Sequence, residues 1–115
     1  MQFSLDTDKA GRFICTLTEG TIVTTVTASN VPAAGNNLLD ALESVQATGL
    51  GECWWEEQGG DYRWLFRRDG DRLTVAVMWS AGTLTGWQHV FRAECDLEWF
   101  AGRVRGEFER IRAIV

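Results

Sequence analysis

The sequence has little of what marks a membrane or secreted protein. Nowhere do about 18 apolar residues run together, and the start, MQFSLDTDKA, has neither a basic segment nor a continuous apolar one. The three cysteines, Cys15, Cys53 and Cys95, are an odd number at wide spacing, which is typical of reduced thiols rather than of a disulfide framework. We therefore expect a cytoplasmic protein that does not enter a membrane.

Positive charge is scarce as well. The chain has 11 lysines and arginines against 16 acidic residues, and its formal net charge is −5. Nucleic acids and anionic lipids attract proteins through basic side chains, so we expect neither as a partner. Only one of the basic residues, Lys9, is a lysine, and this preference for arginine indicates a GC-rich, hence bacterial, genome.

The motifs of enzymes and metal sites are also missing from the sequence. A zinc site needs four ligands in short-spaced pairs, whereas His89 is the only histidine and the cysteines lie far apart. There is no glycine-rich phosphate loop and no serine elbow. Glu56 and Glu57 would point to opposite sides of a strand and cannot share a proton. We predict no catalytic residue, no metal and no cofactor, and therefore a protein that is not an enzyme.

What the chain does have is enough apolar sequence for one compact core. It is 115 residues long and 45% hydrophobic, which is within the range of a single globular domain. No linker, repeat or shift in composition divides it. We expect residues 1–115 to form one domain.

Glycine turns between alternating apolar runs predict three β-hairpins. The runs are RFICTLTEGTIVTTVTAS, ECWWEEQGGDYRWLF and YRWLFRRDGDRLTVAVMW, and the last two share a strand. The expected two-residue turns are Glu19-Gly20, Gly59-Gly60 and Asp69-Gly70.

The predicted turns determine which side chains face each other across the two central hairpins. Trp55 then opposes Trp64 in the core, and Glu56 opposes Arg63 as a cross-strand ion pair. Trp54 points to the opposite face of the sheet, where no predicted helix packs on it. A leading strand at Phe3 and Leu5 and a last strand, WQHVFRAEC, complete the set, and alternation in the last strand places four residues on the core side: Trp87, His89, Phe91 and Ala93.

Two segments have a helical period. NLLDALESVQATG has Asn37 as the helix N-cap and Gly49 as its stop. The second helix begins after Asp96 and has one apolar stripe, made of Leu97, Phe100, Ala101, Val104, Phe108, Ile111 and Val115. Gly102 and Gly106 inside it require either a close backbone approach or a weak helix.

These elements predict an α+β fold. We expect a single antiparallel sheet of six or seven strands in the order β-β-β-α-β-β-β-β-α, with two helices packed on one face. The other face would then be uncovered and partly apolar, and exposed patches of this kind are typical of binding surfaces. The candidate interface residues are Trp54, Glu56, Arg63, Leu65, Arg67, Arg72, Met78 and Val90.

Four interpretations of this face and its surroundings stay open at this point. The face can bind a protein partner, or form a homodimer. A loop such as SAGTLTG can instead fold over Trp54. The last alternative is a small-molecule site or enzyme pocket between sheet and helices, near Cys53, Tyr62 and His89.

Part of the chain resembles a known group of proteins. The run RRDGDRLTVAVMW, then Trp87 and Phe91 in the last strand, then DLEWFAGRVRGEF resembles small uncharacterised bacterial α+β proteins, some of which look like immunity proteins of toxin systems. The resemblance covers roughly Leu38 to Phe108 and transfers no functional residue. It implies a small acidic protein that binds another protein stoichiometrically, as an immunity-type inhibitor does.

Overall fold

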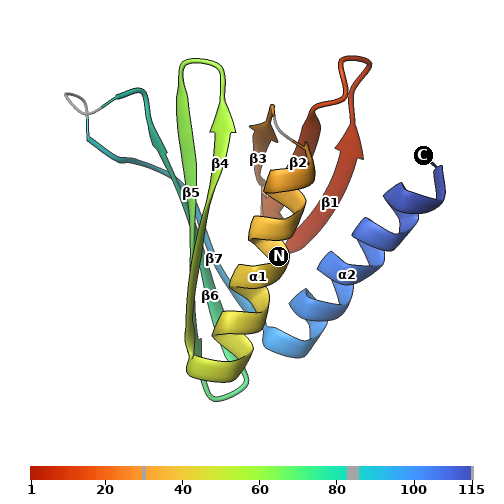
Figure 1. Ribbon diagram of the computed structural model, residues 1–115. Coiled ribbons are helices and arrows are strands. Elements are labelled where there is room, and N and C mark those ends of the chain that lie inside the picture. Colours follow the sequence, from red (N-terminus) through yellow and green to blue (C-terminus); the bar gives the residue numbers. More distant parts are fainter. Residues whose placement is uncertain (30, 83–85, 115) are drawn as a thin grey trace.

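The computed structural model describes residues 1–29, 31–82 and 86–114, with side chains as far as Ile111 (Figure 1). Seven strands and two helices follow each other in the predicted order. They are β1 (Gln2–Thr7), β2 (Phe13–Glu19), β3 (Ile22–Ala28), α1 (Val31–Thr48), β4 (Leu50–Glu57), β5 (Gly60–Asp69), β6 (Arg72–Ser80), β7 (Gln88–Asp96) and α2 (Leu97–Ile114). No helix in the described ranges is long and apolar enough to cross a membrane.

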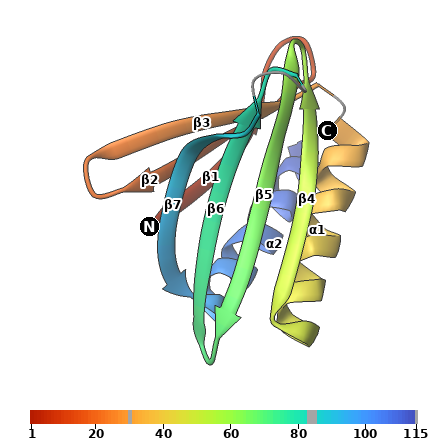
Figure 2. The same cartoon turned by 90° about the vertical axis from the view of Figure 1, so that its left-hand side faces the viewer.

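The strands form two antiparallel sheets, so the prediction of a single sheet is wrong. One sheet has three strands, β1-β2-β3, and the other has four, β4-β5-β6-β7. Figure 2 shows the three-stranded sheet crossing behind the four-stranded one. The chain leaves β3 into α1, which packs on β4, and β3 meets β4 only near their ends, where the Ser29 N–H donates to the Glu56 carbonyl at 2.9 Å.

Both sheets and both helices contribute to one core. Phe13 of β2 packs against Trp55 of β4 with ring centroids 5.9 Å apart, and Phe100 of α2 contacts both Phe3 and Phe66 at 5.7 Å. The two helices lie on the inner side of the four-stranded sheet (Figure 2). Trp55 and Trp64 are fully buried whereas Trp54 is 43% exposed, which confirms the predicted facing of the central strands.

Each hairpin turn lies one residue away from its predicted place. The observed turns are Gly20-Thr21, Gln58-Gly59 and Gly70-Asp71. A type I′ turn needs positive φ at both central residues, but in each of these turns only the glycine has it. The pairing therefore shifts by two residues, which leaves the side chains of these three hairpins on their predicted faces.

The shift corrects two predicted pairs. Trp55 opposes Tyr62 rather than Trp64, and Glu56 opposes Asp61 rather than Arg63. The predicted ion pair between Glu56 and Arg63 is therefore wrong.

A β-bulge in β7 overturns the expected facing of its first half. Phe91 opposes Val77, but the next pair joins His89 to Met78, so two residues of β7 oppose one of β6. The bulge moves His89 out of the core row, and it is exposed. Trp87 is displaced in the same way and is 39% exposed. The expectation that both residues face the core is wrong.

Helix α1 begins well before the predicted cap, Asn37. Pro32 is tolerated in the first turn of a helix. Gly35 lies where α1 packs on aromatic rings, and a Cβ there would be 3.2 Å from the ring of Phe108. The predicted end is confirmed, because Gly49 has φ +90° and its N–H donates to the Val45 carbonyl.

Helix α2 begins where predicted. Asp96 accepts a hydrogen bond from the Trp99 N–H at 2.9 Å, as an N-cap does. The predicted apolar stripe is buried from Leu97 to Ile111, and its last member, Val115, lies outside the described residues.

The outer edge of β1 is covered by side chains of α2. Glu107 accepts from the Leu5 N–H at 3.1 Å, Arg103 donates to the Phe3 carbonyl at 2.9 Å, and Arg110 donates to the Leu5 carbonyl. Arg110 also binds Glu107, with an Nε–Oε2 distance of 2.8 Å. This network satisfies an edge that would otherwise present unpaired backbone groups to other chains.

Replacing Gly102 or Gly106 with alanine should stabilise the protein. Among the described residues, no atom other than the adjacent residues and the nearby backbone of α2 lies within 4 Å of where a Cβ would stand at either glycine, and neither has positive φ. No close approach therefore requires glycine, and each substitution should add about 0.5–1 kcal/mol to the free energy of unfolding in urea titrations. Gly70→Ala is the opposite control, because Gly70 has φ +60° and alanine there should destabilise. A loss of stability in both helix variants would contradict the prediction.

Candidate functional site

The outer face of the four-stranded sheet is the strongest candidate site. We define the outer face as the side chains of β4 to β7 that point away from the helices, together with Trp87. Two rows run across its strands: Glu52–Leu65–Ala76–Arg92 and Trp54–Arg63–Met78–His89. Seven of the eight predicted interface residues have register positions on this face, because the register shift of two preserved their direction. The eighth, Val90, is the extra residue of the β7 bulge, next to the outward-facing His89.

Two indoles on the outer face flank one arginine. The guanidinium carbon of Arg63 is 5.5 Å from the ring centroid of Trp54 and 5.8 Å from that of Trp87, within the range of cation–π attraction. Glu52 holds the same guanidinium from the side, with an Nη2–Oε2 distance of 2.7 Å. Arg63 thus lies against both exposed indoles, and Glu52 neutralises its charge.

Sequence reasoning missed Trp87 because it assumed unbroken alternation along β7. One signal of the irregularity was available. The only histidine, His89, stood at a predicted core position between aromatic neighbours, and a polar residue in an apolar row is a local conflict.

Two like charges stand beside Trp54. Glu56 and Asp61 are direct cross-strand neighbours, and Glu56 is exposed. With Trp54 they line a small hollow of about 300 Å³ at the start of α1, where Asn37 donates to the Trp54 carbonyl at 3.3 Å. Like charges directly opposite each other in a sheet are destabilising, so folding alone does not explain this pair.

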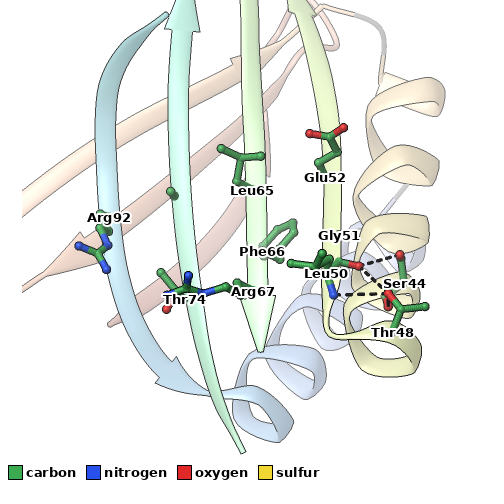
Figure 3. Close-up of a pocket in the computed structure, with 11 residues that line it drawn as sticks. Ser44, Thr48, Leu50, Gly51, Glu52, Leu65, Phe66, Arg67, Thr74 and Arg92 are labelled. Atoms are coloured by element: carbon green, nitrogen blue, oxygen red, sulfur yellow. Dashed lines mark hydrogen bonds between the residues drawn. The ribbon is translucent and has the colours of Figure 1, made fainter. Parts of the chain in front are cut away.

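A larger hollow lies on the outer face next to the Trp54 row. It has a volume of about 780 Å³ and reaches around the edge of β4 to α1 (Figure 3). The residues that line it are Ser44, Thr48, Leu50, Gly51, Glu52, Leu65, Phe66, Arg67, Thr74, Ala76 and Arg92.

The three predicted pocket residues do not share a site. Cys53 is buried, and burial followed by the charge of Glu52 raises the pKa of its thiol to about 12. Tyr62 packs on Trp79 with ring centroids 4.6 Å apart on the inner side of the sheet, and burial raises its pKa. His89 lies on the outer face. The Cys53 thiol therefore stays protonated near neutral pH, and His89 lies on the opposite face of the sheet from it.

The fold and this face define a two-sheet α+β protein with one sheet surface that no described helix covers. The middle of the SAGTLTG loop, residues 83–85, lies outside the described residues, so a cover from this loop stays a prediction. No protein-family model matches the chain, and comparisons with curated proteins and with solved structures find no significant match. The resemblance to immunity-like bacterial proteins therefore stays a prediction.

Proposed function

We propose that the protein binds another protein through the outer face, without catalysing a reaction. The observation that carries the proposal is the pair of exposed indoles, Trp54 and Trp87, held by Arg63 on a sheet face that no described helix covers. Tryptophan and arginine dominate the binding energy of protein interfaces, and here two tryptophans and one arginine are in contact on one surface.

The neighbours of the two indoles fit the same role. Leu65, Met78 and Val90 are half-buried on this face, so a partner can remove further apolar area from water. Exposed apolar patches of this kind are a feature of interaction sites. Contact with Arg63 restricts the two indoles before binding, so less side-chain entropy is lost when a partner binds.

The partner is expected to be a basic protein. The chain has a net charge of −5, and Glu56 and Asp61 place two carboxylates beside Trp54. A cationic side chain of a partner would relieve the repulsion between Glu56 and Asp61. A positive net charge on the partner would also speed its association with this acidic chain. Two copies of this chain would instead repel each other, which disfavours the homodimer. An immunity-type inhibitor would act in this way on a basic toxin.

The test is affinity capture from cells of the source organism, followed by binding measurements with the purified partner. Trp54→Glu and Trp87→Glu should each weaken binding by about 30-fold, the loss that a hot-spot residue causes. Trp99→Glu is the matched control, because Trp99 is 40% exposed but lies on α2. It should bind as the wild type does.

Two results would overturn the proposal. One is a purified partner that Trp54→Glu and Trp87→Glu bind as tightly as the wild type does. The other is sedimentation showing a wild-type dimer that Trp54→Glu converts to a monomer, which would make a second copy the occupant of the face.

A further inference from the structure

We infer that the hollow of about 780 Å³ on the outer face binds a small apolar ligand that carries one carboxylate. Its volume is within the range of small-molecule sites. It lies outside the sheet, and not between sheet and helices as the sequence predicted for such a site. The hollow shares Leu65 and Arg67 with the proposed protein-binding surface, but the ligand is inferred from the residues of the hollow alone.

The cationic end of the hollow is formed by Arg67 and Arg92. Figure 3 shows both side chains beside Thr74, one from each neighbouring strand. Within the described residues neither guanidinium has an ion-pair partner, in contrast to Arg63, which Glu52 neutralises. Two free guanidinium groups about one hydroxyl group form a donor set for a carboxylate, because arginine binds carboxylates with paired N–H groups.

The rest of the hollow is suited to an apolar body. Leu65 and Ala76 are direct neighbours on its floor, and Leu50 stands at its rim with 62% of its surface exposed. Ser44 and Thr48 donate their hydroxyls to the Leu50 carbonyl at 2.8 and 3.1 Å, so they hold the rim in place. Burying the exposed part of Leu50 under a ligand is favourable.

Glu94 restricts the charge of the ligand. It is exposed and directly opposite Thr74 on β7, so it opposes anions at this end of the hollow. Two guanidinium groups and one carboxylate give this end of the hollow a net charge of about +1, which a single negative charge on the ligand neutralises. A monocarboxylate with an apolar chain therefore fits the site better than a phosphorylated compound does.

The probe for the inference is octanoate. Its binding is measured from changes in the amide chemical shifts of the full chain in solution. Octanoate should give saturable shifts centred on residues 65–67, 74–76 and 92, and octanol and octylamine should bind at least about tenfold more weakly. Arg67→Gln and Arg92→Gln should each reduce octanoate affinity by about tenfold, and Glu94→Gln should increase it. Arg72→Gln is the matched control, because Arg72 is on the same face but does not line the hollow.

The outcomes separate this site from the protein-binding function. Trp54→Glu, which should weaken partner binding by about 30-fold, should leave octanoate affinity within about twofold. The inference is overturned if octanoate gives no saturable shift, if octanol binds equally well, or if the Arg67 and Arg92 variants bind as Arg72→Gln does. Circular dichroism of each variant shows whether it is folded.

Discussion

Alanine in place of Gly51 is expected to cost about 3 kcal/mol of unfolding free energy and to lower Tm by about 10 °C or more. Gly51 lies on β4 directly under α1, where a Cβ would stand 2.3 Å from the Ala41 carbonyl oxygen and 3.3 Å from the Val45 nitrogen. These are backbone atoms of a helix, which no rotamer change can move aside. The whole helix has to move away from the sheet, and contacts of the core are lost with it.

The measurement is urea unfolding of Gly51→Ala beside Gly102→Ala, which makes the same chemical change in open space. The prediction requires opposite signs, a large loss at Gly51 and a small gain at Gly102. An equal effect of the two substitutions would show that α1 does not approach β4 as closely as the structure has it.

The facing of the central strands could be predicted because it depends only on alternation. Trp55 and Trp64 are buried and Trp54 is exposed, although both central hairpins pair two residues away from the predicted register. A shift of two changes every partner but no face. The pairing itself depends on whether the glycine is the first or the second residue of the turn. The sequence does not show which, because the residues on both sides of each glycine are also common in turns.

The errors have different physical causes. The bulge at His89 depends on how β7 meets β6, and alternation has no signal for one extra residue. The division into two sheets depends on where α1 packs. The early start of α1 could not be predicted, because Pro32 and Gly35 are residue types typical of loops. In the structure Gly35 is helical and packs against Phe13 and Phe108.

The candidate site was predictable in part for the same reasons. The outward residues of β4 to β6 follow from alternation, so Trp54, Arg63 and Met78 were found. Trp87 was not found, because the bulge moved it. The hollow at Arg67 and Arg92 depends on the curvature of the sheet and on the edge of β4, which are properties of the tertiary structure.

Removing the carboxylate of Glu107 is the other substitution with a large expected effect. Glu107 is only 5% exposed, accepts from the Leu5 N–H and is held by Arg103 and Arg110. Glu107→Ala leaves the Leu5 N–H without its acceptor and Arg103 without its counter-charge, and it leaves Arg110 paired with Asp6 alone. We expect a loss of about 3 kcal/mol, whereas Glu109→Ala, on the exposed side of the same helix, should change stability by less than about 0.5 kcal/mol.

The pH dependence of this loss identifies its cause. Burial acts to raise the pKa of Glu107, but hydrogen bonds from Arg110 and Leu5 and the charges of Arg103 and Arg110 outweigh it, so its pKa lies below the ordinary 4.5. A carboxyl with a lowered pKa contributes stability that is complete above its ordinary pKa and is lost as pH falls through the folded value. Glu107→Gln keeps an acceptor for the Leu5 N–H but has no charge to titrate. The stability difference between wild type and Glu107→Gln should therefore shrink as pH falls below 4.5, whereas a constant difference would show that packing, not charge, makes Glu107 important.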